Sequence, residues 1–206
     1  NELLTFSKIE MKQMRISVRK GDIMHFLEEL SHIFDIVAGE REIDFIVNLE
    51  DTEEEVWFSP SKLERILYNL LSNAFKYTQP GGYVKLSAKL IKEEKETFVQ
   101  ISVKDNGRGI PKEAQEQIFE SYYQVEKRDH REGFGLGLSL TRSLIHMHKG
   151  EIRVESEINK GSDFIVTLNV SEDAYNPDER SSENITTEEI QKYNQRIKET
   201  IELIPE

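Results

Sequence analysis

The stretch GFGLGLSL at residues 133–140 places three glycines within five positions and leads directly into a helical pattern. Glycine has no Cβ, so the backbone of such a segment can approach a ligand closely, and phosphate is the usual ligand where the segment opens a helix. The spacing is wrong for a P-loop, because no Gly-Lys-Ser/Thr sequence follows. It is also wrong for a G-x-G-x-x-G fingerprint, because Leu138 stands where the third glycine should be. Taken alone, the segment fits a phosphate site and a structural turn equally well.

The composition narrows the class of protein. The chain has 206 residues, of which 37% are hydrophobic and 32% charged, as expected for one globular domain with polar attachments. It contains no cysteine, which excludes disulfides, thiolate zinc sites and cysteine nucleophiles. The net charge of −12 argues against a nucleic-acid surface. We find no apolar run long enough to cross a membrane and no signal-peptide pattern, so we expect no direct membrane contact from this fragment.

Hydrophobic periodicity predicts alternating helices and strands through the body of the chain. Asp22 would cap a helix over 23–38, and Ser59 with Pro60 would start another at 61–77. The expected strands cover 15–18, 43–49, 56–59, 83–91, 97–105, 151–156 and 163–170, and a further helix covers 136–148. This order indicates an α/β (α+β) two-layer sandwich, in which helices cover one face of a mixed, mostly antiparallel sheet.

The C-terminal part differs in composition from the body. Residues 171–206 contain ten Asp or Glu and four Lys or Arg, so they carry half of the net charge. We expect an acidic linker at 171–185, followed by an amphipathic helix at 186–206 that begins with a capping box of Thr186 and Glu189. The apolar stripe of this helix would be Ile190, Tyr193, Ile197, Ile201 and Ile204. The remaining divisions are 1–15, which reads as the end of a helix, and a main domain at 16–170.

Two further motifs precede the glycine-rich stretch. In DNGRGIP at 105–111, Asp105 follows a strand and could accept a hydrogen bond deep in a pocket, such as one from an adenine amino group. The same letters are also good turn chemistry. Asn69 and Asn73 lie four residues apart on one face of a mainly apolar helix. Buried amides need partners, which a hard cation with phosphate oxygens would supply, whereas capping or solvent exposure is the alternative.

Together, the motifs resemble those of one family. LERILYNLLSNAFKYTQPGG at 63–82 is similar to the N box, VKDNGRGIP at 103–111 to the G1 box, QIFESYYQ at 117–124 to the F box, and GFGLGLSL to the G2 box. Over roughly residues 16–170 the chain resembles the catalytic, ATP-binding domain of sensor histidine kinases, within the gyrase–Hsp90–histidine kinase–MutL superfamily. The resemblance implies the Bergerat (GHKL) fold, protein-histidine kinase activity, and ATP and Mg²⁺ as ligands.

The resemblance also implies roles for single residues. Asn73 would bind Mg²⁺, Asp105 would accept the adenine amino group, and Ser162 would steady a water beside it. The catalytic residues would be Asn69, which would support the metal or the phosphates, together with Lys76 and Arg108 near the phosphates. The residues around the nucleotide would be Asn73, Tyr77, Asp105, Gly107, Gly109, Ile110, Phe119, Gly133, Gly135, Leu136, Gly137, Leu138 and Ser162.

A lid over the nucleotide is expected at 120–134, anchored by Phe119 and hinged by the glycines of the G2 box. Its cations, Lys127, Arg128 and Arg131, would either meet the γ-phosphate or belong to a solvated loop. Asn69 stands where the ATPases of the superfamily have a glutamate that activates water. An amide cannot take a proton at neutral pH, so we expect slow or absent intrinsic hydrolysis. An ATPase and a nucleotide-binding scaffold without transfer activity are the competing readings.

The phospho-accepting histidine is not found in this chain. His32 lies within LSHIF, but the sequence does not continue as the acceptor motif does, so we interpret His32 as a helix-surface residue. The expected partners are a dimerisation domain of the same kinase that carries the histidine, and a receiver domain, separate or fused. By the same resemblance, residues 1–15 would be the end of a helix of that dimerisation domain. The parent protein would be a homodimer anchored in the membrane, with this fragment in the cytoplasm.

Overall fold

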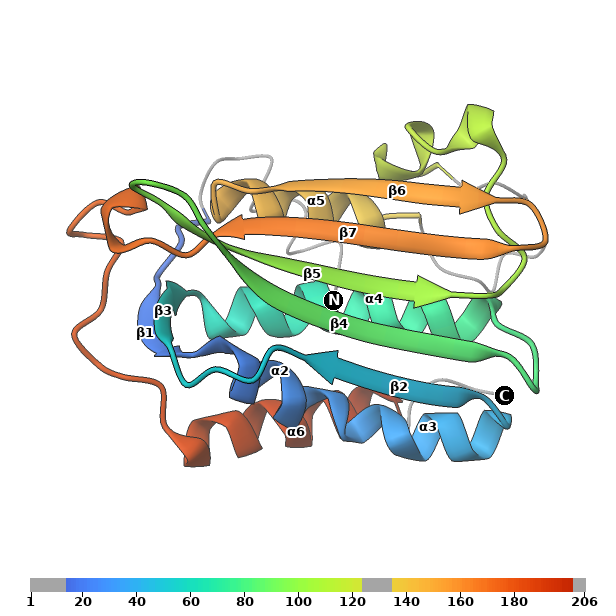
Figure 1. The fold of residues 1–206 in the computed structure, drawn as a ribbon, viewed down its shortest axis with the longest axis horizontal. Helices are drawn as coiled ribbons and strands as arrows, with labels where there is room; N and C mark the ends of the chain where they lie inside the picture. The colour runs from blue at the N-terminus through green and yellow to red at the C-terminus, as the bar shows by residue number, and fades with distance from the viewer. Residues whose placement is uncertain (1–13, 124–134, 202–206) are drawn as a thin grey trace.

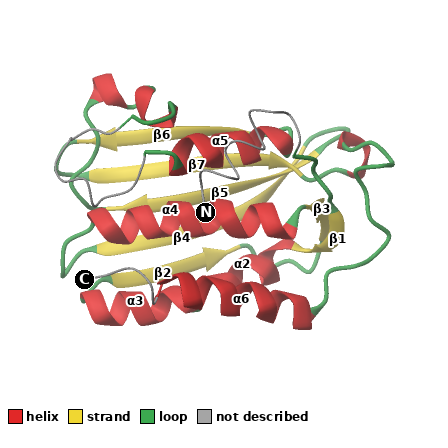
Figure 2. Cartoon of the chain, turned by 180° about the vertical axis from the view of Figure 1, so that it is seen from behind, coloured by secondary structure: helices red, strands yellow, loops and turns green. Residues whose placement is uncertain are grey.

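The computed structural model describes residues 14–123 and 135–201, which form two layers (Figure 1). One layer is a five-stranded sheet in the order β2-β4-β5-β7-β6, and the helices lie on one face of it (Figure 2). The strands of this sheet are β2 (Asp44–Leu49), β4 (Tyr83–Lys92), β5 (Thr97–Asp105), β6 (Glu151–Glu157) and β7 (Gly161–Asn169). The helices are α2 (Ile23–Ser31), α3 (Ile33–Arg41), α4 (Pro60–Tyr77), α5 (Gly137–Met147) and α6 (Thr187–Ile201). The expected two-layer class is confirmed.

The sheet is mixed and mostly antiparallel, as the sequence indicates. β2 runs parallel to β4, whereas the pairs β4–β5, β5–β7 and β6–β7 are antiparallel. Side chains alternate along each strand, so one face can be apolar while the other faces solvent. On β4, for example, Val84, Leu86 and Ala88 are buried, while Lys85 and Ser87 are only partly covered. The inward-facing residues of the sheet pack against the helices to form the main core.

α4 is the central helix of the second layer, and α5 packs beside it (Figure 2). Its buried residues recur at helical spacing and face the core; they are Leu63, Ile66, Leu67, Leu70, Leu71, Ala74 and Phe75. Pro60 occupies the first turn after Ser59, as expected. The partly exposed face of α4 that remains carries the two asparagines of the N-box-like motif.

The helix expected at 23–38 is two helices, α2 and α3, with His32 at the junction. The cap at its start is confirmed, because the Asp22 carboxylate accepts a hydrogen bond from the backbone N–H of His25 at 2.9 Å. The break follows Ser31, whose hydroxyl donates to the carbonyl of Glu28 at 2.7 Å. Such a bond competes with the helical ladder and bends helices. His32 is exposed, in agreement with its interpretation as a surface residue.

The strand expected at 15–18 is displaced along the chain. The observed strand is β1 (Arg19–Asp22), which pairs with β3 (Glu55–Phe58) in a separate two-stranded sheet. The alternation at 16 and 18 has a different cause, since Ile16 and Val18 pack against Tyr175 in a small second cluster. Apolar alternation alone could not tell this packing from strand pairing.

The C-terminal residues run back over the N-terminal ones. Val18 donates its N–H to the carbonyl of Glu179 at 2.8 Å, and the Arg19 guanidinium meets the Glu189 carboxylate at 2.6 Å. α6 then packs on α2, with Ile190, Tyr193 and Ile197 buried. The Thr186 hydroxyl accepts the N–H of Glu189 at 3.3 Å, as the capping motif predicts. The Ile201 side chain, Ile204 and residues 1–13 lie outside what the structure describes.

In the ranges that the structure describes, no helix is both long enough and apolar enough to cross a membrane.

Candidate functional site

One face of α4 forms the floor of the candidate site. Asn69, Asn73 and Tyr77 recur every four residues, so they lie one above another along the helix. All three are partly buried. The Asn69 end of this row meets the start of α5, and the Tyr77 end meets the loop that follows β5. The helix therefore joins three of the sequence motifs on one surface.

Asp105 ends β5 and is 5% exposed. Its Oδ1 accepts a hydrogen bond from the backbone N–H of Gly107 at 2.8 Å, and the register places it opposite Ser162 on β7. Burial raises the pKa of the Asp105 carboxyl above its usual value, and the backbone N–H groups of Gly107 and Ser162 oppose that rise. The carboxyl is thus held in place by backbone groups and keeps further acceptor capacity for a donor on a ligand.

The loop after Asp105 packs against the end of α4. A Cβ at Gly107 would overlap the backbone oxygen of Tyr77, so this position requires glycine for close approach. The guanidinium of Arg108 lies over the Tyr77 ring at 4.3 Å from its centroid, and the Lys76 ammonium lies 5.3 Å from the same centroid. The two predicted phosphate-end cations, Lys76 and Arg108, are both exposed and share one aromatic neighbour.

The turn between β6 and β7 supports the same loop from the other side. Gly109 has φ of +70°, and a Cβ there would overlap the backbone oxygen of Glu157. The Ser156 hydroxyl accepts the N–H of Ile110 at 2.8 Å and lies 3.0 Å from the Ser162 hydroxyl. Gly109 therefore has a backbone reason to be glycine, in addition to the room for a base that the resemblance implies.

The start of α5 faces Asn69 on α4. A Cβ at Gly137 would lie 2.5 Å from Oδ1 of Asn69, so the first residue of α5 rests directly on that side chain. The first N–H groups of any α-helix have no partner within the helix, and they favour anions. Leu136 is buried and Leu138 packs partly against the core, so these two leucines anchor the helix start.

The expected lid lies mostly outside the described residues. Gly133, Lys127, Arg128 and Arg131 are among residues 124–134, of which the structure describes nothing. On either side of these residues, the N–H of Tyr122 donates a hydrogen bond to the carbonyl of Gly135 at 3.0 Å. Phe119 is buried and packs edge-on against Phe164, with ring centroids 6.4 Å apart. This contact fixes the chain immediately before the segment.

The donor set for a metal in this part of the molecule is amide oxygen. Within residues 14–123 and 135–201, no group of three or more histidines, aspartates and glutamates is arranged to hold a metal ion. Asn69 and Asn73 present amide oxygens on one face of α4, and Mg²⁺ prefers oxygen ligands and usually completes its coordination with water and substrate phosphates.

Two residues near the site have no counterpart in the sequence prediction. Thr141 accepts a hydrogen bond from Nδ2 of Asn69 at 2.7 Å, and the Ser156 hydroxyl joins the G1-like loop to β7. Thr141 could have been suspected as a hydroxyl within the buried stripe of α5. Ser156 has no such signal, because its role depends on the register between β6 and β7.

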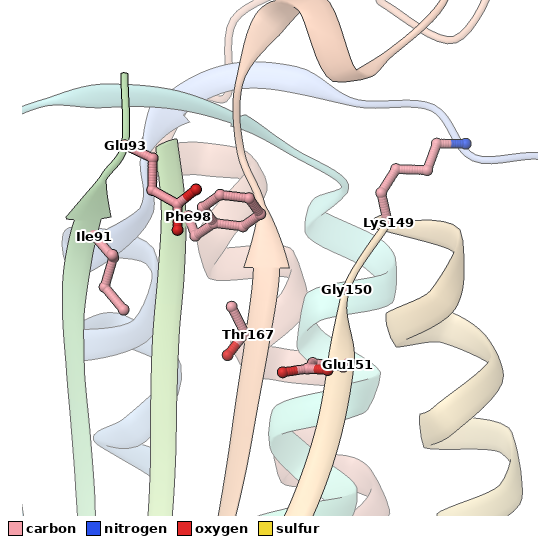
Figure 3. A pocket seen from close by; sticks show the side chains of 7 residues that line it. All are labelled: Ile91, Glu93, Phe98, Lys149, Gly150, Glu151 and Thr167. Carbon is pink, nitrogen blue, oxygen red and sulfur yellow. The ribbon is translucent and has the colours of Figure 1, made fainter. Parts of the chain in front are cut away.

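A separate pocket of about 380 Å³ lies at the opposite end of the sheet from Asp105 (Figure 3). It is formed where the connection between β4 and β5 meets the start of β6. The lining residues are Ile91, Glu93, Phe98, Lys149, Gly150, Glu151 and Thr167. None of the predicted site residues lines it.

Comparison with known proteins identifies the family. The family model described as histidine kinase-, DNA gyrase B-, and HSP90-like ATPase matches residues 58–172, which is more than half of the chain. Histidine kinase P4 of Formosa agariphila is 30% identical over the whole chain, which spans 15% of that protein. The sensor histidine kinase WalK of Bacillus subtilis is 34% identical over 84% of the chain, which corresponds to 28% of that protein. The chain thus spans only a small part of these curated relatives.

Solved structures show the same fold. Full-length ShkA in complex with AMPPNP matches with a TM-score of 0.72 and 26% identity, over 83% of this chain and 35% of that one. The catalytic domain of histidine kinase ThkA matches with a TM-score of 0.65 and 25% identity, over 76% of this chain and 99% of that one. The chain belongs to the histidine kinase-, DNA gyrase B-, and HSP90-like ATPase family, and within it to the catalytic domains of sensor histidine kinases.

Proposed function

We propose that this domain binds ATP with Mg²⁺ and transfers the γ-phosphate to a histidine in a dimerisation domain outside this chain, for relay to an aspartate of a receiver domain. The single observation that carries the proposal is the buried Asp105 carboxylate. It accepts a hydrogen bond from the N–H of Gly107, in the loop that meets the end of α4. One face of α4 carries the amides of Asn69 and Asn73. This arrangement offers an acceptor for a base at one end and oxygen ligands with a helix start at the other.

In this proposal, Asp105 accepts the amino group of adenine, and Ile110 with Gly109 lies beside the base. Asn73 would hold Mg²⁺, which would neutralise phosphate charge when bound, and Asn69 would support the metal or the phosphates. The start of α5 would face the phosphates, and the long side chains of Lys76 and Arg108 would reach toward them from beside the Tyr77 ring. The Ser162 hydroxyl would order a water near Asp105 while sharing its hydrogen bond with Ser156. Phosphoryl transfer depends mainly on positioning and charge stabilisation, which these groups supply.

The side chain of Asn69 favours transfer over hydrolysis. An amide cannot accept a proton from water at neutral pH, so this position provides no general base. We therefore expect the bound γ-phosphate to persist until an acceptor histidine reaches it. The proposal extends to a homodimeric parent kinase with a membrane anchor and a receiver domain, separate or fused. The much greater length of the curated relatives leaves room for such parts.

The first test is calorimetric titration of the chain with AMPPNP and Mg²⁺, beside the Asp105→Asn variant. We expect Mg²⁺-dependent binding that falls by at least tenfold in the variant, because an amide presents a donor where the base also presents one. Asp163→Asn is the matched control: Asp163 lies near the same end of the sheet on the adjacent strand β7, and its Oδ1 accepts a hydrogen bond from the Ser102 hydroxyl at 2.6 Å. Equal affinity for wild type and Asp105→Asn would overturn the assignment.

The second test supplies the missing acceptor. The chain is mixed with the dimerisation helices of its own kinase and labelled ATP, and acid-labile phosphate on the helices is measured. Phosphohistidine formation that requires Asn73 supports the kinase. Nucleotide binding without any transfer would indicate a scaffold, and steady phosphate release that Asn73→Ala abolishes would indicate an ATPase.

A further inference from the structure

The Asn69 side chain is held by two residues of α5 that lie one helical turn apart. Its Nδ2 donates to the Thr141 hydroxyl at 2.7 Å. Its Oδ1 points at the start of the same helix, where a Cβ on Gly137 would lie 2.5 Å away. Residues 137 and 141 are spaced i and i+4, so both contacts come from one face of α5. The amide is therefore hydrogen-bonded through its nitrogen, and its oxygen lies against the first residue of α5.

We propose that Thr141 is a positioning residue, whose hydroxyl sets the orientation of the Asn69 amide so that Oδ1 faces the first turn of α5. A primary amide has one oxygen that can bind a cation and one nitrogen that can only donate. Occupying the nitrogen with Thr141 leaves the oxygen toward the end of the site where the phosphates would lie. The inference rests on the proposed function for its consequence, but the orientation itself is a property of the chain.

The hydroxyl of Thr141 is a polar group in mainly apolar surroundings. Thr141 is 1% exposed and lies in the same buried stripe as Leu140, Leu144 and Ile145. A valine has nearly the same shape and would fill this space with no polar group to satisfy. A buried hydroxyl is retained at no loss only where it has a partner, and here the partner is Asn69.

Without the hydroxyl, the amide would lose the hydrogen bond that holds its nitrogen, and the side chain could rotate. Rotation by half a turn would exchange Oδ1 and Nδ2 and would present N–H groups toward the metal. Binding that depends on Mg²⁺ would then weaken, whereas contacts of the base with Asp105 would be unaffected. Because Thr141 and Gly137 belong to α5, any shift of that helix would also move the amide, which links the G2-like and N-box-like motifs mechanically.

The test compares Thr141→Val with Thr141→Ser in the chain, using AMPPNP titrations with Mg²⁺ and with EDTA. We expect Thr141→Val to weaken Mg²⁺-dependent binding by about five- to tenfold, the loss expected for one hydrogen bond. Binding in EDTA should change by less than about twofold, and Thr141→Ser should restore the wild-type value. Equal losses in Mg²⁺ and EDTA, or none in either, would overturn the proposal.

A second readout does not depend on nucleotide. The side-chain NH₂ resonances of Asn69, assigned by their loss in Asn69→Ala, report its hydrogen bond directly in NMR spectra. They should shift and exchange faster with solvent in Thr141→Val, and return in Thr141→Ser. Unchanged resonances would refute the positioning role. If wild type bound no nucleotide, the proposed function would fail, while these resonances would still decide whether Thr141 holds the amide.

Discussion

The backbone N–H of Ser59 donates a hydrogen bond to Nε2 of His148 at 3.1 Å. On its other side, Nδ1 of His148 lies 2.9 Å from the carbonyl of Leu144 and donates to it. This pairing requires the neutral imidazole, with its proton on Nδ1. The fully buried ring thus joins the start of α4 to the end of α5, the two helices that carry Asn69 and Gly137.

This neutral histidine predicts acid sensitivity. Burial, with Lys62 nearby, lowers the pKa of His148 from 6.5 to about 4. The unfolded chain therefore binds a proton more readily than the folded one, so stability is complete above pH 6.5 and is lost as the pH falls toward 4. We expect a loss of about 3 kcal/mol over this interval. Urea unfolding at pH 7 and pH 4 measures it.

The control for this prediction is His148→Gln, whose side-chain oxygen can still accept the N–H of Ser59 but does not titrate in this range. The variant should show a weaker dependence of unfolding free energy on pH between 4 and 6.5. An unchanged dependence would mean that other groups cause the acid sensitivity.

Glu64 on α4 predicts the opposite dependence of stability on pH. Burial raises its pKa from 4.5 to about 7, although the Arg196 guanidinium, 4.0 Å away, opposes the rise. The folded chain then binds a proton more readily, so this contribution is complete below pH 4.5 and is lost as the pH rises through 7. Glu64→Gln should remove the loss and raise the unfolding free energy at pH 8 by about 2 kcal/mol.

The comparison for Glu64 is the same variant at pH 4.5, where the wild-type carboxyl is largely protonated and the two chains should be equally stable. A gain of equal size at both pH values would indicate a change in packing, rather than removal of a buried charge.

Much of the fold could be predicted because its signals are local. The alternation in β4 and β5, the cap at Asp22 and the apolar stripe of α4 each depend on residues close together in the sequence. The misplaced strand at 15–18 and the break at His32 depended on other information. The first required knowing that Tyr175 packs on Val18, and the second required one side-chain hydrogen bond of Ser31.

The residues of the candidate site also divide into those with a local sequence signal and those that depend on contacts between distant parts of the chain. Asp105, the two asparagines of α4 and the glycines of the described segments could be proposed from the sequence, because they belong to motifs that follow one another in a fixed order. Thr141 was missed because its importance comes from a contact with Asn69, 72 positions away in the sequence. His148 belongs to none of the sequence motifs, because its hydrogen bond with Ser59 joins residues that no sequence pattern connects.

Alanine substitutions at Gly109 and Gly81 would distinguish the stability cost of backbone conformation from the cost of close contact. Both have positive φ, +70° and +79°, but a Cβ at Gly81 meets nothing within 4 Å, whereas one at Gly109 would overlap the backbone of Glu157. Gly81→Ala should therefore cost about 1 kcal/mol of stability, from conformation alone. Gly109→Ala should cost about 3 kcal/mol or more and should also weaken AMPPNP binding. Equal thermal unfolding of the two variants would contradict the contact at Gly109.

The last prediction concerns α6, which buries Tyr193 against the domain. The Tyr193 ring packs edge-on against Phe26, with centroids 5.8 Å apart, and the Arg196 guanidinium lies over the Tyr193 ring at 4.6 Å from its centroid. Tyr193→Ala should lower the unfolding free energy by about 3 kcal/mol, because it leaves a cavity over α2. Gln191→Ala, at an exposed position of the same helix, should change it by less than about 0.5 kcal/mol. Since α6 lies on α2, away from Asp105, AMPPNP affinity should be the same in both variants. A Tyr193→Ala chain as stable as Gln191→Ala would show that α6 is not docked in solution.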